Sequence, residues 1–350
     1  MNTELRIFAV GARTPVGLDA ASSAAAARAG ISRVADHPLL FDDAGAPLRA
    51  GRVPTIDPAL CGPQRVVQLA VAALSEAALA ASEKAALPPS LPVFLALPNS
   101  RPGFGIAETH VVVRGIEAAK IPSVTRIEVT PVVGGHAGGI LALEMAATRI
   151  AQRDAEMCFV GGVDSYLEAD ALDWLEADRR LAREGVRGGF SPGEGAAAFV
   201  VAGTQGAARL RLKSLARVRS VATGQEPRSI DSDEGLLGEG LTDVVRRAAE
   251  GLRLPDERVD DIYCDINGER HRTDEWGFTI LRAWQVFRDG TTYTTNVGHW
   301  GDLGAASAAV NCVLMIQAWR RRYASGPKAM IWGSSPEGLR AAAIFETEES

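Results

Sequence analysis

Hydrophobic and polar positions divide the chain into short apolar runs and longer segments with helical spacing. Residues 5–11 and 93–97 are apolar runs of strand length, and the second ends at a proline and an asparagine. Residues 64–81 repeat apolar side chains on one helical face, and the Ala-rich segment 19–29 predicts another helix. Strands that alternate with helices in this way are typical of an α/β protein.

The most informative segment is residues 124–146, where a β-branched run leads into a glycine-rich turn. The turn reads Gly-Gly-His-Ala-Gly-Gly at residues 134–139, and no charged residue follows it before Glu144. This pattern predicts a strand, a tight elbow that requires glycine, and the start of a buried helix. Because unpaired N–H groups and the positive end of the helix dipole meet at such an elbow, the position of His136 suits an anion or a nucleophile.

This elbow resembles the nucleophile elbow of the β-ketoacyl-acyl-carrier-protein synthases of the thiolase superfamily, in which a cysteine opens a buried helix of small residues. Residues 154–165 resemble the next strand and Gly-Gly turn of that family, and residues 187–201 resemble its Gly-Phe…Gly-Glu-Gly-Ala strand. Residues 296–309 resemble its second catalytic-histidine loop. The resemblance implies a thiolase fold, with two similar βαβαβαββ halves packed as α-β-α-β-α layers.

The second half of the sequence repeats the first. The matched segments are residues 93–97 with 262–266, 157–161 with 329–333, 196–200 with 341–345, and Gly135-His136 with Gly298-His299. We therefore predict an N-terminal thiolase-like half at residues 1–205 and a C-terminal half at residues 206–350, together forming one compact unit. His136 and His299 would then meet in one cleft from opposite halves.

Ketosynthase chemistry needs a thiolate, two polar groups that are usually histidines, and an oxyanion hole, and the chain departs from the family in three places. The resemblance places His136 where the family has its cysteine, and Asn267 where it has its first histidine. Pro336, which has no N–H to donate, stands at the oxyanion donor. His299 keeps the place of the second histidine. The candidate site is therefore a degenerate one, made of His136, Asn267 and His299.

The other histidines and the cysteines carry no site signal. His37, His110 and His271 lie in segments that predict surface positions. The cysteines lack the spacing of metal or redox sites and are interpreted as small buried hydrophobic residues: Cys61, Cys158, Cys264 and Cys312. We accordingly expect no metal and no cofactor.

Composition limits the classes of function. A hydrophobic content of 47% with 23% charged residues is ordinary for a soluble globular protein, and a net charge of −6 argues against nucleic-acid binding. The first residues lack a signal peptide, and we find no apolar run of membrane-span length, so we expect a cytoplasmic protein without a membrane partner. Residues 30–60, which contain four prolines, predict irregular surface chain, and residues 167–184 predict an acidic helix.

Two functions fit these observations. The first is a β-ketoacyl synthase-like protein that has lost condensing activity and acts as a binding, accessory or partner subunit. It would form a homodimer, or a heterodimer with a related subunit; the resemblance implies pairing through residues 124–129, because in that family this edge strand pairs across the dimer axis. Its other partners would be an acyl-carrier protein, an acyl thioester, or a secreted or biosynthetic partner protein.

The alternative is an acyl-thioester enzyme that needs no thiolate, namely a decarboxylase, hydrolase or acyltransferase. It would use His136, Asn267 and His299, with a neutral His136 imidazole as general base.

Overall fold

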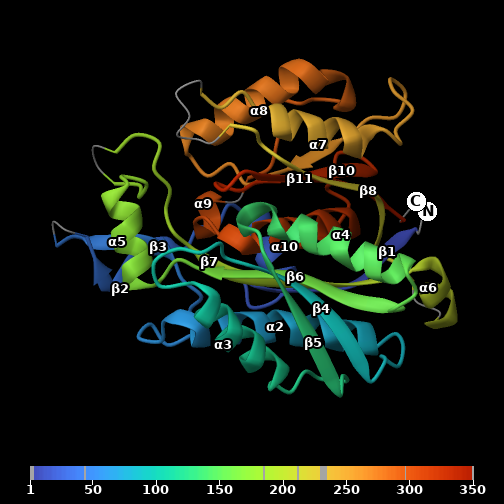
Figure 1. The fold of residues 1–350 in the computed structure, drawn as a ribbon, viewed down its shortest axis with the longest axis horizontal. Coiled ribbons are helices and arrows are strands. Elements are labelled where there is room, and N and C mark those ends of the chain that lie inside the picture. Colours follow the sequence, from blue (N-terminus) through green and yellow to red (C-terminus); the bar gives the residue numbers. More distant parts are fainter. Residues whose placement is uncertain are drawn as a thin grey trace.

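The computed structural model of the chain describes residues 4–42, 45–183, 186–210, 213–228, 235–295 and 297–348. Its helices are α1 (Ala20–Arg28), α2 (Gly62–Ser82), α3 (Ile106–Glu117), α4 (Gly138–Ala151), α5 (Ala169–Ala177), α6 (Thr204–Leu210), α7 (Glu239–Ala249), α8 (Arg270–Ala283), α9 (Val297–Trp300) and α10 (Ser307–Arg320). In Figure 1, α7 and α8 cover one outer face, α2 and α3 cover the other, and α4 and α10 lie together between two levels of strands. The predicted α-β-α-β-α arrangement is confirmed.

The main sheet repeats one strand order on both sides of its centre. Its strands are β1 (Leu5–Arg13), β4 (Ser90–Leu97), β5 (Arg126–Val133), β6 (Met157–Ser165), β7 (Glu194–Gly203), β8 (Ala216–Gln225), β9 (Asp261–Tyr263), β10 (Lys328–Ser334) and β11 (Leu339–Thr347). Within the described chain their order is β5-β4-β6-β7-β1-β8-β11-β10-β9. The first strands of the two halves, β1 and β8, join the halves through pairs such as Leu5 with Val218.

The two halves are therefore built alike, as the internal repeat predicts. Counted outward from the centre of the sheet, the strands of the first half are β1, β7, β6, β4 and β5, and those of the second half are β8, β11, β10 and β9. The second half has no fifth strand within the described chain, but an isolated bridge between Tyr263 and Thr294 lies beside β9 in the place that corresponds to β5. The predicted boundary between residues 205 and 206 falls inside α6 and stays a prediction.

The two central helices carry the core that positions the site. Every residue of α10 from Ala308 to Trp319 is buried, including the polar Asn311 and Gln317, so this helix is buried on all sides and mostly apolar rather than amphipathic. A side chain at Gly162 on β6 would come within 2.3 Å of the Ala305 carbonyl oxygen, so only glycine lets this strand approach the turn before α10 so closely. The starts of both central helices are fixed by such tight backbone packing.

The segment 30–60 differs from the prediction of irregular chain. It contains a two-stranded antiparallel sheet of β2 (Val34–Phe41) and β3 (Pro47–Gly51). The ladder pairs Val34 with Gly51 and Phe41 with Pro47, and its register shifts between Asp36 and Phe41, around Pro38. Prolines are tolerated here because each strand has an unpaired edge and the ladder is interrupted where Pro38 lies.

Two helices also differ from their predictions. The acidic helix predicted at residues 167–184 is shorter and covers only Ala169–Ala177, and Glu184 lies outside the described residues. Contrary to our expectation, α2 is long and apolar enough to cross a membrane by length and composition alone. In this fold it packs against β1, β6 and β7 and buries residues such as Leu69 and Leu74, which is the position of a core helix.

Candidate functional site

The elbow after β5 forms as predicted. Gly135 has φ of 51°, in the left-handed region that favours glycine, and opens the 3-10 turn η1 (Gly135–Ala137), which runs directly into α4. His136 lies within this turn and is 3% exposed. A histidine side chain therefore stands at the buried start of the first central helix.

The second central helix begins in the same way, but not at the predicted place. Gly304 has φ of 48° and opens the 3-10 turn η3 (Gly304–Ala306), which runs into α10 and packs against η1. The counterpart of His136 is therefore Ala305, and the predicted match between Gly135-His136 and Gly298-His299 is wrong. His299 belongs instead to the short helix α9, and Asn296 of the predicted histidine loop lies outside the described residues.

His299 does not reach the cleft. Its carbonyl oxygen accepts a hydrogen bond of 2.8 Å from the Arg33 N–H, and its half-buried ring lies edge-on to Trp300 with 6.1 Å between the ring centroids. It is not among the described residues that line the large cavity beside His136. The structure therefore brings His136 and Asn267 together and leaves His299 elsewhere.

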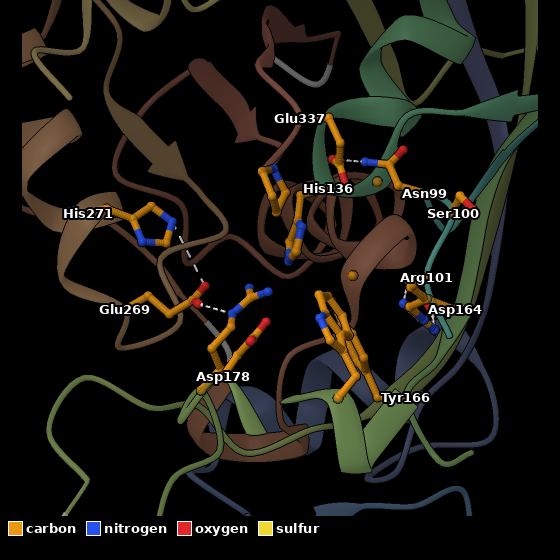
Figure 2. Close-up of a pocket in the computed structure, with 15 residues that line it drawn as sticks. Asn99, Ser100, Arg101, His136, Asp164, Tyr166, Asp178, Glu269, His271 and Glu337 are labelled. Carbon is orange, nitrogen blue, oxygen red and sulfur yellow. Dashed lines mark hydrogen bonds and ion pairs between the residues drawn. The ribbon is translucent and has the colours of Figure 1, made fainter. Parts of the chain in front are cut away.

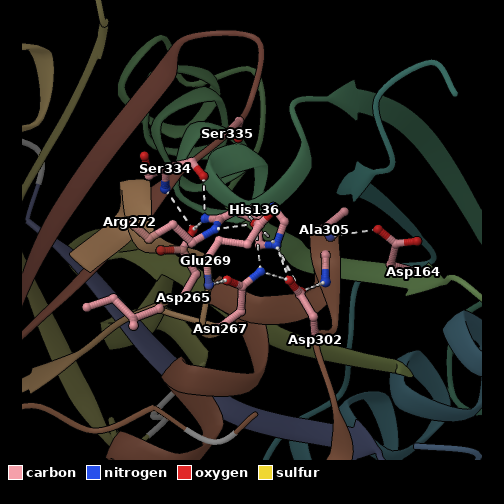
Figure 3. A network of polar contacts seen from close by, with 12 residues as sticks. His136, Asp164, Asp265, Asn267, Glu269, Arg272, Asp302, Ala305, Ser334 and Ser335 are labelled. Carbon is pink, nitrogen blue, oxygen red and sulfur yellow. Dashed lines mark hydrogen bonds and ion pairs between the residues drawn. The ribbon is translucent and has the colours of Figure 1, made fainter. Parts of the chain in front are cut away.

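Asp302 is the group that joins His136 to Asn267. Its carboxylate oxygens lie 2.8 and 3.0 Å from His136 Nε2, and Asn267 Nδ2 donates to it at 2.5 Å (Figure 3). The Gly304 N–H also donates to this carboxylate, at 2.7 Å. Asp302 is held in place by its own N–H, which donates to the Ser191 carbonyl at 2.8 Å.

Arg272 on α8 completes the buried network. Its Nη1 donates to Asp265 at 2.9 Å and to the Ser334 carbonyl at 2.7 Å, and its Nε lies 3.2 Å from Glu269. Its Nη2 lies 3.4 Å from His136 Nδ1 and 3.5 Å from His136 Nε2, so the guanidinium lies against the imidazole ring and does not point at one nitrogen. The short contacts of the ring are those of Nε2 with the Asp302 carboxylate. His136 is therefore held between Asp302 and Arg272.

The charges of this network stabilise one another. Burial opposes the ionisation of Asp302, but His136, Arg272 and Asn267 more than offset it and hold the pKa of Asp302 well below its usual range. Burial likewise opposes the ionisation of Glu269, while the Arg272 and Arg180 guanidinium groups lower its pKa to about 2. Both carboxylates are therefore ionised at neutral pH.

A cavity of about 660 Å³ opens beside this network. Figure 2 shows Tyr166 across the cavity from His136, with Glu269 and His271 on one wall and Arg101 and Asp164 on the other. The full lining is Asn99, Ser100, Arg101, Gly135, His136, Asp164, Tyr166, Trp174, Asp178, Arg180, Glu269, His271, Gly304, Pro336 and Glu337. Its lining contains several charged side chains beside two aromatic ones, so it is not a purely apolar acyl pocket.

The buried charges of the cavity wall are paired. Arg101 lies 2.6 Å from Asp164 and stacks 4.3 Å above the Tyr166 ring, and Arg180 lies 2.8 Å from Glu269. Two carboxylates at the rim are less neutralised: Asp178 is exposed, and Glu337 is bonded only to the Asn99 amide among the described side chains.

Two histidines predicted at the surface are not exposed: His37 is buried and His271 is half-buried. His271 lines the cavity, where burial and then the charge of Arg272 lower its pKa to about 4, so it is neutral at physiological pH. His37 is 4% exposed. His110 is exposed, as predicted.

The cysteines follow their prediction in part. Cys158, Cys264 and Cys312 are buried, and burial raises the pKa of Cys158 to about 12. Cys61 is exposed at the N-terminus of α2, which corrects its predicted burial. Among the described residues no cluster of three or more His, Cys, Asp or Glu side chains could hold a metal ion.

Sequence reasoning missed most of the polar network. Asp302, Asp265, Glu269 and Arg272 were not predicted as site residues. One signal was available for Asp302: it is the single ionisable residue just before the small-residue run at 304–309, which opens the second buried helix. No comparable pattern marks Arg272, because its partners come from separate segments.

No protein-family model and no curated protein matches the chain. Solved structures do. The ketosynthase from module 6 of the bacillaene synthase from Bacillus subtilis 168 is 13% identical with a TM-score of 0.76, and the match covers 99% of this chain and 72% of that one.

Two further matches span nearly the whole of both chains. The ishigamide ketosynthase/chain length factor is 21% identical, with 98% and 99% coverage and a TM-score of 0.69. A ketosynthase bound to the hexaketide, in complex with its type II polyketide synthase acyl-carrier protein, is 14% identical, with complete coverage of both chains and a TM-score of 0.81. At these identities the likeness concerns the fold, and the chain has the thiolase-like fold of the ketosynthases.

Proposed function

We propose that this protein is a ketosynthase-like subunit without condensing activity, which works by binding a partner or a ligand. One observation carries the proposal: the start of α4, where the resemblance places the family's cysteine, holds His136, with its Nε2 2.8 Å from the Asp302 carboxylate. An imidazole cannot form the stable acyl thioester on which ketosynthase chemistry depends.

The chain's own thiols do not replace the missing one. Cys158 lies within β6, Cys264 follows directly after β9, and Cys312 lies inside α10, so none of them begins a helix. Burial raises the pKa of each of these thiols, which keeps them protonated and unreactive. Cys61 is not among the described residues that line the cavity.

Three of the N–H groups at the two helix starts are already occupied. The Ala137 N–H donates to Ser335 Oγ at 3.0 Å, and the Ala305 N–H donates to Asp164 at 2.9 Å. The Gly304 N–H is taken by Asp302. Pro336, in the place of the family's donor, lines the cavity and has no N–H. Losing the nucleophile and one donor costs about five orders of magnitude or more in rate.

The comparisons support an association role. One similar structure is a ketosynthase/chain length factor, and another is a ketosynthase in complex with an acyl-carrier protein. From these two structures we propose that this protein forms a homodimer, or a heterodimer with a related subunit, and that an acyl-carrier protein is a candidate partner. The edge position of β5 is consistent with such a dimer, because an unpaired strand edge can pair across a two-fold axis.

A second candidate is the thiolate-independent acyl-thioester enzyme. The observation that favours it is the His136–Asp302 pair, with Asn267 attached, on the wall of an open cavity large enough for a thioester headgroup. Such a pair is the orienting half of a general-base arrangement. His299 is not part of it, so the reaction would depend on His136.

The decisive test incubates the purified protein with malonyl and acyl thioesters of coenzyme A and of carrier protein, and follows substrate loss and intact protein mass. His136→Ala and His299→Ala are measured beside it, the second as a control outside the cavity. We expect no turnover and no adduct from any of the three proteins. Turnover that disappears in His136→Ala alone would establish the enzyme candidate and overturn the binding proposal.

A further inference from the structure

A second hollow lies against the β2–β3 sheet, away from the central cavity. Its volume is about 430 Å³, and it shares no lining residue with the central cavity. The side chains that matter in it are Arg33, Arg52 and His37 on the polar side, and Ile31 and Pro54 on the apolar side. Its chemistry is independent of what happens at His136.

His37 presents a fixed N–H in this hollow. Its Nδ1 lies 3.2 Å from the Leu39 N–H and 3.1 Å from the Leu40 N–H, and accepts both hydrogen bonds. A nitrogen that accepts two backbone donors is unprotonated, so the proton of the neutral ring is on Nε2. Burial, and then the charges of Arg52 and Arg65, lower the pKa of His37, which keeps the ring in this neutral form.

The Nε2–H of His37 is available to a ligand in the hollow. Among the described residues no group accepts a hydrogen bond from it, and His37 lines the hollow. Nε2 is not one of the fully buried polar atoms that lack a partner, so a ligand oxygen there would take the place of solvent as its acceptor.

The charges around the hollow favour an anion. Arg33 and Arg52 oppose the single carboxylate of Asp36, so two positive charges less one negative charge leave a net charge of +1 among the lining residues. Arg52 uses its Nη1 on the Ile56 carbonyl at 3.1 Å, and its other N–H groups have no acceptor in the described chain. The Arg33 side chain makes no ion pair there. Two guanidinium groups with free donors suit a carboxylate or a phosphate.

We propose that this hollow binds a small organic molecule through an oxyanion group, held by the guanidinium groups of Arg33 and Arg52 and by the Nε2–H of His37. The apolar part of the molecule packs against Ile31 and Pro54. The shared chemistry is that of a carboxylate or phosphate oxyanion, and nothing in the proposal depends on the central cleft being active or inactive.

Isothermal titration calorimetry on the full chain tests this with three probes: inorganic phosphate, phenyl phosphate and butyrate. We expect one site per chain, with phenyl phosphate bound more tightly than inorganic phosphate if the ligand is a phosphate ester, and butyrate bound most tightly if it is a carboxylate. Arg33→Gln and Arg52→Gln should each weaken binding by about tenfold, because each removes a charge-assisted hydrogen bond. Arg33 is exposed, so its substitution leaves folding intact.

Arg49→Gln is the matched control. Arg49 lies on β3 in the same small sheet, but its guanidinium donates to the Val34 carbonyl at 3.1 Å and does not line the hollow. The Arg49→Gln variant should bind the three probes as tightly as the natural protein does. The proposal is overturned if none of the three probes binds, or if Arg49→Gln weakens binding as much as Arg33→Gln and Arg52→Gln do.

Discussion

The starts of the two central helices share one backbone and differ in chemistry. Gly135 and Gly304 have φ of 51° and 48°, each opens a 3-10 turn, and each turn runs into a helix of 14 residues. The first turn carries the ionisable His136, whereas the second carries Ala305 and donates its N–H groups to Asp302 and Asp164. The duplication has kept the path of the backbone, while the chemistry of the cleft comes from side chains of flanking loops.

The largest loss of stability should come from substituting Arg272, which lies on α8 and packs against His136 in the first turn. Arg272→Met leaves the buried carboxylate of Asp265 without its cation and leaves Glu269 with Arg180 alone, and should lower the free energy of unfolding by about 3–5 kcal/mol. Urea unfolding measures this loss. Arg270→Met, two residues earlier on the same helix and 89% exposed, should change the free energy by less than about 0.5 kcal/mol. Equal losses in the two variants would show that the network does not stabilise the fold.

The two glycines should differ when each receives a side chain. An added Cβ at Gly304 lies 2.0 Å from the Asp164 carboxylate, which is buried and paired with Arg101. At Gly135 the nearest atom is the Asn99 amide nitrogen at 2.9 Å, on a side chain at the cavity rim that can move. Both variants have left-handed strain of about 1–2 kcal/mol, so Gly304→Ala should cost about 3 kcal/mol and Gly135→Ala about 1–2 kcal/mol. A larger loss at Gly135, measured by urea unfolding, would reverse the comparison.

The network should also make stability depend on pH. The pKa of His271 is about 4 in the fold and 6.5 in the unfolded chain, so its contribution is complete above pH 6.5 and lost as the pH falls toward 4. Glu269, with a pKa of about 2 against 4.5, contributes above pH 4.5 and loses this contribution as the pH falls toward 2. Between pH 7 and pH 4 the His271 contribution should fall by roughly 2–3 kcal/mol.

The control for this pH dependence is His271→Asn, which cannot take up the proton. Its free energy of unfolding, measured by urea titration at each pH, should stay nearly level down to about pH 5 and fall only as carboxylates protonate. If the natural protein and His271→Asn gave parallel pH profiles of unfolding free energy, the pH dependence would not come from His271.

The smallest effects separate the two histidines that the sequence paired. His136→Ala leaves Asp302 with only Asn267 and backbone donors, and should cost about 1–2 kcal/mol of unfolding free energy. His299→Ala removes a half-buried ring from outside the cavity and should cost less than about 1 kcal/mol. Thermal unfolding resolves this difference, and the opposite order would show that the contact of His136 with Asp302 contributes little to stability.

Much of the fold could be predicted because its signals are local. The glycine-rich turn at residues 134–139, the alternation of apolar runs and helical segments, and the repeat of the two halves each depend on neighbouring residues. The β2–β3 sheet was missed because its prolines were taken to exclude strands, although the unpaired edges of a two-stranded sheet tolerate them.

The site could be predicted only in part, because its network joins separate segments. His271 was predicted at the surface because charged residues flank it, yet Arg272 and Glu269 are buried by pairing with one another and with groups far away in the sequence. His299 was matched to His136 because both follow a glycine. The positive φ that defines the turn belongs to Gly304, and sequence pattern alone does not separate these two glycines.

The most direct measurement installs the missing nucleophile. His136→Cys is incubated with an acyl thioester and then with malonyl-carrier protein, and intact mass and ketoacyl product are followed by mass spectrometry. We expect no condensation product even if the thiol becomes acylated, because Ser335, Asp302 and Asp164 occupy three N–H groups at the two helix starts and Pro336 has no N–H to donate. Steady formation of ketoacyl product by this single variant would show that the cleft lacks only its cysteine, and would contradict the account that its oxyanion donors are lost as well.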